Sequence, residues 1–185
     1  MNIINVNVYG HEQALKASGY PKSTNPLETE PSFYRAKLLA SCKPGTGHDC
    51  FLKGIIVQFD ILGPLYWWPQ FQRYHFADIV SSQSKMHCLH KFKLEEMCNE
   101  WVDSRIIEIA KEHIEHYNNE KSKENFMKMI SNIPTGFKLF ARVVTNYLQL
   151  KTIYLQRKNH KLPEWETFCS WIRALPYSEL IIGGN

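Results

Sequence analysis

Two polar side chains near the middle of the chain have the types and the spacing of a site for an anionic ligand. Gln70 and Arg73 stand three residues apart in a segment that starts at Pro69, and proline is well tolerated at the first position of a helix. Residues three apart share one helix face, where a guanidinium beside a carboxamide can hold a phosphate or the edge of a pyrimidine. An exposed polar helix face produces the same pattern, and spacing alone favours that plainer interpretation.

Histidines occur in two further combinations that could do chemistry. His75 with Asp78 could form an oriented imidazole for acid–base work, although a surface pair is the commoner arrangement at this spacing. His87 and His90 flank Cys88, but a zinc site needs further ligands, and no second cluster in the sequence supplies them. We therefore expect no metal site.

Aromatic residues make up 13% of the chain, and three of them are consecutive in Tyr66-Trp67-Trp68. Such a run can stack on a flavin or a base, but a buried aromatic cluster is the commoner explanation. The motifs G-x-x-x-x-G-K-[ST], G-x-G-x-x-G and G-x-S-x-G do not occur in the sequence. Their absence argues against P-loop, Rossmann and serine-hydrolase interpretations.

The chain has 185 residues, of which 44% are hydrophobic, and a formal net charge of +4. This size predicts one domain over residues 1–185 with a sizeable core. The small, scattered positive surplus suits a phosphate-bearing small molecule better than nucleic acid. No apolar stretch is long enough for a membrane span, and no secretory signal is recognisable. The five cysteines lack a paired motif, so we expect reduced thiols in a cytoplasmic protein.

Hydrophobic periodicity predicts the elements that must position these side chains. Alternation predicts strands at residues 3–8 and 55–62, the second ended by Gly63-Pro64. Helical spacing predicts helices at residues 32–40, 69–75, 94–117, 126–130, 137–157 and 162–175. Together these strands and helices predict an α+β fold with a small central sheet flanked by long helices.

Two blocks in the first half of the sequence resemble the flavin-dependent thymidylate synthases. Gly47-His48-Asp49, the strand at 55–62 and Gly63-Pro64 stand where the family has G-H-E, a strand and Gly-Pro or Ala-Pro. Residues 70–75, QFQRYH, stand where the family has Q-W-F-R-H-R, and they continue into the remainder of its signature at 81–86.

A third block follows in the second half, and the resemblance covers most of residues 1–175. Ile133-Pro134, Thr145-Asn146 and Arg157 reproduce the spacing of the family's L-P, T-V-N and L-R. The individual letters are less faithful, because Tyr74 and His75 replace the second and third residues of R-H-R. Where the family has charged side chains near the nucleotide or the flavin, this chain has Ser81, Lys53, Ile130 and Leu148.

The resemblance implies an enzyme that uses FAD, methylenetetrahydrofolate and NADPH to place a one-carbon unit on C5 of a deoxypyrimidine monophosphate, with dUMP as the first choice. It implies active sites between the subunits of a homotetramer and no catalytic cysteine. The nucleotide-side residues it implies are Gln70, Arg73, Ser81, Gln83, Ser84, Lys85 and Arg157, of which Arg73 and Arg157 are the catalytic ones. The flavin-side residues it implies are His48, Cys50, Tyr74, His75, Asn146 and Thr152.

Two alternatives stay open at this point. The altered stretch from Ser81 to Lys85 motivates the same chemistry on another nucleotide, such as dCMP. The changes at 53, 130 and 148 motivate a catalytically inactive protein that still binds a nucleotide or a flavin. Lys85, Lys128 and Arg142 are the cations that could replace the missing phosphate-binding arginines.

Overall fold

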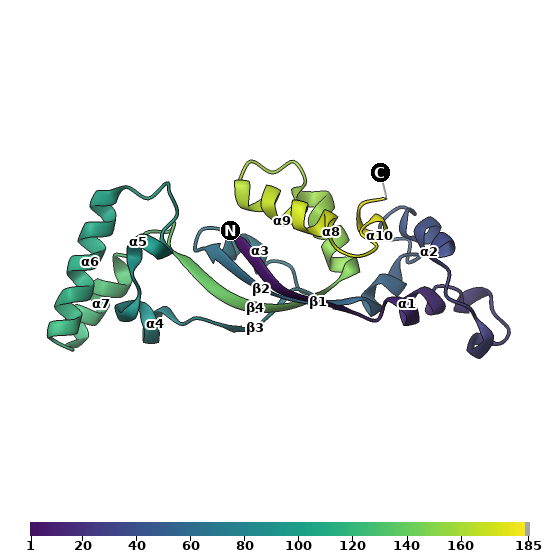
Figure 1. Ribbon diagram of the computed structural model, residues 1–185, viewed down its shortest axis with the longest axis horizontal. Helices are drawn as coiled ribbons and strands as arrows, with labels where there is room; N and C mark the ends of the chain where they lie inside the picture. The colour runs from purple at the N-terminus through teal and green to yellow at the C-terminus, as the bar shows by residue number, and fades with distance from the viewer. Residues whose placement is uncertain (184–185) are drawn as a thin grey trace.

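A curved antiparallel sheet of four strands forms the middle of the computed structural model, which describes residues 1–183 (Figure 1). The strands are β1 (Asn2–Tyr9), β2 (Ile56–Pro64), β3 (Asp78–Ser82) and β4 (Lys138–Asn146). Their order across the sheet is β1-β2-β4-β3. This small sheet and the helices around it confirm the α+β class predicted from the sequence.

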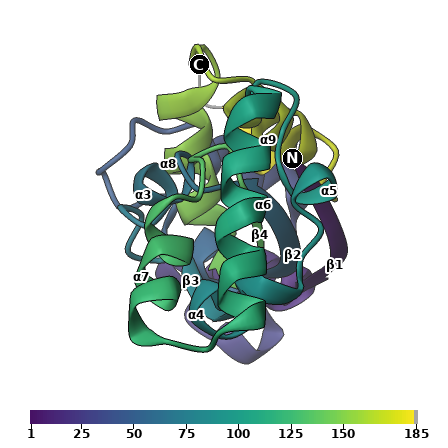
Figure 2. The same ribbon diagram turned by 90° about the vertical axis from the view of Figure 1, so that its left-hand side faces the viewer.

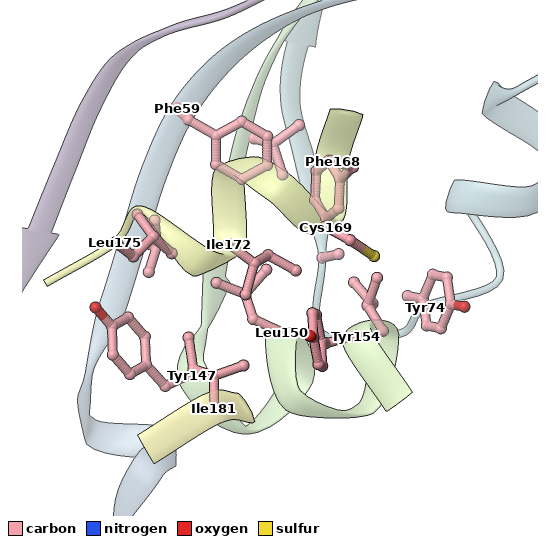
Figure 3. Packing of buried hydrophobic residues seen from close by; sticks show 14 of the residues in the cluster. Phe59, Tyr74, Tyr147, Leu150, Tyr154, Phe168, Cys169, Ile172, Leu175 and Ile181 are labelled. Atoms are coloured by element: carbon pink, nitrogen blue, oxygen red, sulfur yellow. The ribbon is translucent and has the colours of Figure 1, made fainter. Parts of the chain in front are cut away.

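The central strands β2 and β4 pair along their whole length, starting with Ile56 opposite Asn146. Val57, Phe59 and Ile61 point to one face and are completely buried, as the alternation in β2 predicts. Figure 3 shows Phe59 packed among apolar side chains of the helices that cover this face. These helices are α8 (Tyr147–Arg157), α9 (Pro163–Arg173) and α10 (Glu179–Ile182).

The single helical segment predicted at 137–157 is wrong in its first half. Residues 138–146 form β4, and α8 begins only at Tyr147. Ala141, Val143 and Thr145 are buried on the inner face of the sheet, which is the period of two expected for a strand. Pairing with β2 on one side and β3 on the other gives these residues their conformation, because strand preference depends on neighbouring strands more than on local sequence.

The helix predicted at 69–75 is also too long, because α3 (Trp68–Phe71) has only one turn. Arg73 lies in the turn that leads to β3, so it does not share a helix face with Gln70. Asp78 is the first residue of β3, so it is not paired with a histidine on a helix. The β3 strand itself was missing from the prediction.

The aromatic run belongs to the core. Trp67 is fully buried, stacks on Phe71 with 4.7 Å between ring centroids, and contacts Trp165 of α9 at 5.0 Å. These ring contacts hold α3 against α9, and α3 ends at Phe71, whose side chain is also buried. The commoner interpretation of Tyr66-Trp67-Trp68, a buried aromatic cluster, is therefore confirmed for its two tryptophans.

A helical lobe lies at one end of the sheet and has a small core of its own (Figures 1 and 2). Leu89, Leu94, Ala110, Met129 and Phe137 are buried in this core. The one helix predicted at 94–117 is two helices, because residues 98–103 leave the helical conformation. The helices of the lobe are α4 (Lys85–Cys88), α5 (Leu94–Met97), α6 (Ser104–Asn119) and α7 (Lys123–Ser131).

At the other end of the sheet lie α1 (His11–Ala17) and α2 (Phe33–Ala40), and a loop leads from α2 to the 3₁₀ turn Cys50–Gly54 before β2. All five cysteines are free thiols, as expected from their number and spacing. Burial raises the pKa of the Cys169 thiol to about 11, so this thiol is protonated and unreactive at neutral pH. Among residues 1–183, no helix combines the length and the apolar character that a membrane crossing requires.

Two glycines with a left-handed backbone conformation test how closely the segment between β1 and α1 packs against the segment before β2. Gly10 (φ 83°) joins β1 to α1, and a β-carbon there would overlap the carbonyl oxygen of Gly54, whereas one at Gly45 (φ 86°) would meet no atom within 4 Å. We expect Gly45→Ala to lower the free energy of unfolding by about 1–2 kcal/mol, the cost of this conformation for an L-residue. Gly10→Ala should cost about 1–3 kcal/mol more, because of the overlap. Urea unfolding of both variants measures the difference, and equal losses would contradict the close approach of Gly10 to Gly54.

Candidate active site

A groove follows the exposed side of α8. It consists of three adjoining hollows of about 400, 410 and 270 Å³, and Thr152 in the middle of α8 borders all of them. The turn at residues 73–76 forms one wall, and the segment at residues 44–53 forms the other. Two segments from the first half of the chain therefore face one another across a helix from its second half.

Arg157 closes the first hollow, at the C-terminal end of α8. Its Nε donates to the Tyr74 hydroxyl at 2.8 Å, and its Nη1 donates to Oε1 of Gln70 at 3.4 Å. Its guanidinium carbon lies 4.7 Å from the centroid of the Trp165 ring, which is a cation–π distance. A cation in the last turn of a helix is also favoured by the helix dipole. Arg157 is thus held in place before any ligand arrives.

Gln70 is fixed by the same group of side chains. Its Oε1 accepts a second hydrogen bond, from the indole nitrogen of Trp165 at 3.0 Å. Because Arg157 and Trp165 both donate to this oxygen, the orientation of the Gln70 carboxamide is fixed. Gln70 does not border the first hollow, whereas Arg73 does, although Arg73 is exposed and lies outside α3. The structure therefore brings Gln70 and Arg157 into contact, and places Arg73 on the rim of the same hollow.

Tyr74 and His75 occupy different positions in this wall. Tyr74 is buried, and its hydroxyl donates to Oε1 of Gln156 at 3.1 Å while it accepts from Arg157. His75 is exposed and borders the first hollow. The turn is held to α8 through Phe76, whose backbone N–H donates to Oε1 of Gln149 at 3.3 Å. This hydrogen bond holds the backbone of the turn that carries Arg73 and His75.

Asn146 and Thr152 lie at the second hollow, which also has Lys53 and Leu148 on its walls. Asn146 is the N-cap of α8, and its Oδ1 accepts the backbone N–H of Gln149 at 2.9 Å. The amide nitrogen of Asn146 is the part of the side chain that remains for a ligand. Lys53 and Leu148, two positions at which the sequence departs from the family pattern, thus lie in one hollow.

His48 and Cys50 lie on the far side of the 44–53 segment. Both are exposed and border a fourth hollow of about 600 Å³, which reaches α1 and α2. Cys50 and Gly47 also border the third hollow of the groove. The flavin-side residues predicted from the sequence therefore fall on both sides of one short loop.

The remaining predicted residues, Ser81, Gln83, Ser84 and Lys85, lie outside the groove. Ser81 and Gln83 belong to the edge of the sheet, where the side-chain oxygen of Gln83 accepts the backbone N–H of Phe140 at 3.0 Å. Ser84 and Lys85 stand at the start of α4, in the helical lobe. One copy of the chain does not bring these four residues to Arg157.

Two of the three cations considered as replacements for the missing arginines are already paired. Arg142 donates to Asp60 at 3.2 Å and to Gln58 at 3.1 Å, on the sheet face away from α8. Lys128 pairs with Glu124 at 2.6 Å on the surface of α7. Ile130 packs against the core of the helical lobe. Lys85 is the third cation, and no ion pair within residues 1–183 involves it.

The charged side chains on the first two hollows of the groove are all cationic. Among the described residues that border the first two hollows, Lys53, Arg73 and Arg157 are cationic and none carries a carboxylate. The backbone N–H of His160 donates to the carbonyl of Arg157, and burial, followed by the positive charges of Arg157 and Lys161, lowers the pKa of its imidazole. A groove with this distribution attracts an anionic ligand.

Several residues that shape the groove were not identified from the sequence. Phe76, Gln149 and Gln156 border it, and Trp165 supports Arg157. Lys151 is buried on the inner side of α8 and pairs with Asp49. A signal for Lys151 was present, since it occupies an apolar position in the helical repeat of Tyr147, Leu150 and Tyr154.

This architecture is the fold of the flavin-dependent thymidylate synthases. Two solved structures of one such enzyme, ThyX from Helicobacter pylori, both with FAD and dUMP, superpose with TM-scores of 0.75 and 0.79. The first is 16% identical and the match covers 100% of this chain and 99% of that chain; the second is 17% identical and the match covers 99% and 98%. No family model matches the sequence, and no curated protein matches it. The fold is therefore shared over the full length, while the sequence has diverged widely.

The preformed contacts of Arg157 predict the effect of removing it. With dUMP as the probe, Arg157→Ala should weaken binding by about tenfold to a hundredfold, because hydrogen bonds to a charged group are lost. The circular dichroism spectrum should stay unchanged. Arg173→Ala is the matched control, since Arg173 also rests over a tyrosine, Tyr154, at 6.0 Å, but does not border the groove. Equal dUMP affinity in wild type and Arg157→Ala, measured by calorimetry, would remove Arg157 from the site.

Proposed function

We propose that this protein is a divergent flavin-dependent thymidylate synthase-like enzyme. It would transfer a one-carbon unit from methylenetetrahydrofolate to C5 of a deoxypyrimidine monophosphate, with dUMP as the first choice. The observation that carries the proposal is the arrangement of Arg157, Gln70 and Tyr74 at the end of a groove whose first two hollows are cationic, within a fold shared with enzymes solved with FAD and dUMP.

In this proposal, Arg157 and Gln70 orient the nucleotide, and Arg73 adds positive charge at the rim. An arginine held by a tyrosine and a tryptophan needs no rearrangement to polarise a pyrimidine carbonyl or neutralise a phosphate. The buried pair of Tyr74 and Trp165 also shields Arg157 on one side, which strengthens its interaction with an anion. Arg73 and Arg157 are the residues to which we assign the catalytic role.

The second hollow suits FAD in its chemistry, and the third hollow adjoins it with the ion pair of Asp49 and Lys151 on its wall. The amide of Asn146, the hydroxyl of Thr152 and the ammonium of Lys53 are polar groups that an anionic cofactor can use, with the apolar side chain of Leu148 between them. We also assign His48, Cys50 and His75 to the flavin side, although these residues border the neighbouring hollows. Bound FAD would supply the redox step of methylene transfer, with NADPH as the source of reducing equivalents.

We also propose a homotetramer with active sites between subunits. Ser81, Gln83, Ser84 and Lys85 lie outside the groove of their own chain and could reach the groove of another copy. The face of the sheet away from α8 carries exposed apolar side chains, including Ile4 and Tyr9, which are 39% and 52% exposed. Such a face is typical of a protein contact surface. A cytoplasmic location is part of the same proposal.

Two observations bear on the alternatives to this proposal, which are another substrate and an inactive binding protein. The altered signature residues from Ser81 to Lys85 make dCMP the second candidate substrate, because in the proposed tetramer they would reach the nucleotide from another copy of the chain. An inactive flavin- or nucleotide-binding protein is the third candidate, because Leu148 offers no charge to a flavin. Lys53 lies on the wall of the same hollow and keeps one cation there, which favours retained binding.

The absorption spectrum of the protein incubated with FAD tests the proposal. We expect bound FAD, visible as a yellow protein after removal of free flavin, and a change of its spectrum on titration with dUMP. Release of tritium from C5-labelled dUMP and dCMP, each with methylenetetrahydrofolate and NADPH, then separates the two substrates. Both enzymatic candidates would be excluded by a protein that stays colourless at high micromolar FAD. A yellow protein that releases no tritium from either nucleotide would support the inactive binding protein.

A further inference from the structure

A lysine is buried in the middle of α8, on the side that faces the protein interior. The side chain of Lys151 is 2% exposed, and that of Asp49 is 7% exposed. Lys151 Nζ donates to Oδ2 of Asp49 at 2.6 Å and to the backbone carbonyl of Ala40 at 2.6 Å. An ammonium group removed from water is tolerated only when it is paired and hydrogen-bonded, so these two bonds account for its presence in the core.

The two partners stand at the two ends of one loop. Ala40 is the last residue of α2, where helix carbonyls lack intrahelical partners, and Asp49 directly precedes the 3₁₀ turn Cys50–Gly54. Lys151 therefore ties both ends of the loop at 41–49 to a single point on α8. Between these ends residues 43–48 are exposed, and a β-carbon at Gly45 or Gly47 would meet nothing within 4 Å.

This loop forms the wall of the groove opposite Arg73. Gly47, Asp49 and Cys50 border the third hollow together with two residues of α8, Lys151 and Thr152. His48, next to Asp49, borders the fourth hollow with Cys50. The position of the flavin-side residues His48 and Cys50 thus depends on where Asp49 is held.

We propose that Lys151 is a positioning residue, which holds the loop at 41–49 against α8 in the geometry that binds the cofactor. This inference rests on the proposed function, because it assigns the loop to the FAD side of the groove. Lys151 borders the third hollow, but its ammonium group is hydrogen-bonded to Asp49 and Ala40, so it acts through these two partners. The resulting expectation is that removal of the pair loosens this loop and weakens FAD binding more than it disturbs the sheet.

Four variants test this role. Lys151→Met removes the charge and keeps most of the stem, and the double variant Asp49→Asn with Lys151→Met leaves no unpaired buried charge, so it decides the outcome if the single variant does not fold. Lys151→Arg keeps the charge and tests for rescue. Lys111→Met is the matched control, because Lys111 pairs with Glu95 at 2.8 Å on the surface of the helical lobe.

Two measurements are compared across the variants: amide hydrogen exchange in the ligand-free protein and the Kd for FAD from flavin fluorescence. In both variants that remove the ammonium, exchange should rise at residues 41–54 but not in β2 or β4. Their Kd should rise by about tenfold to a hundredfold, the size of effect produced by a small displacement of binding groups. Lys151→Arg and Lys111→Met should keep both values close to wild type.

Wild-type exchange and wild-type FAD affinity in the double variant would overturn the proposal. So would faster exchange spread evenly over the whole sheet, since that result indicates a general contribution to stability. A wild-type chain that binds no FAD would contradict the proposed function alone. The exchange measurement on ligand-free protein would still show whether Lys151 holds the loop.

Discussion

The pairing of β2 with β4 is the constraint on which the rest of the molecule depends. It runs without interruption from Ile56 opposite Asn146 to Pro64 opposite Lys138. Because the strands are antiparallel, the start of β2 lies beside the end of β4. The loop and 3₁₀ turn that precede β2 therefore meet the first turn of α8, and the backbone N–H of Tyr147 donates to the carbonyl of Ile55 at 3.0 Å.

The same pairing decides what the helices cover. Burial of alternate residues in both strands creates one apolar face, on which α8, α9 and α10 pack. The aromatic side chains of α3 and α9 then interlock beside α8, and this packing places Trp165 beneath Arg157. The candidate active site is thus built on the outer side of a helix whose inner side belongs to the core. A rigid support of this kind keeps polar groups in position before a ligand binds.

The interactions that organise the groove are of two kinds. Arg157 is held by hydrogen bonds and a cation–π contact with side chains that are themselves packed. Lys151 is held by a buried ion pair, which is costly to break from one side but adds little stability relative to apolar residues of the same size. Such a pair fixes geometry more than it adds stability, which fits its place at the base of a loop.

The sequence by itself determined the α+β class, the strand at 55–62 with its buried alternate residues, and the aromatic core around Trp67. These features follow from local periodicity, which is set by residue type. It also indicated Arg157 and Gln70, through a family resemblance in spacing, and the solved structures bear out the shared fold.

Only the tertiary structure decided that residues 138–146 form a strand, since their partners lie about eighty residues earlier. It also decided that α3 ends at Phe71, whose ring packs against Trp67 and Phe168 in the core. The contacts of Arg157 with Tyr74, and of Lys151 with Asp49, join residues eighty or more positions apart. Contacts of this kind depend on how the chain packs in three dimensions, which a single sequence read along its length does not reveal.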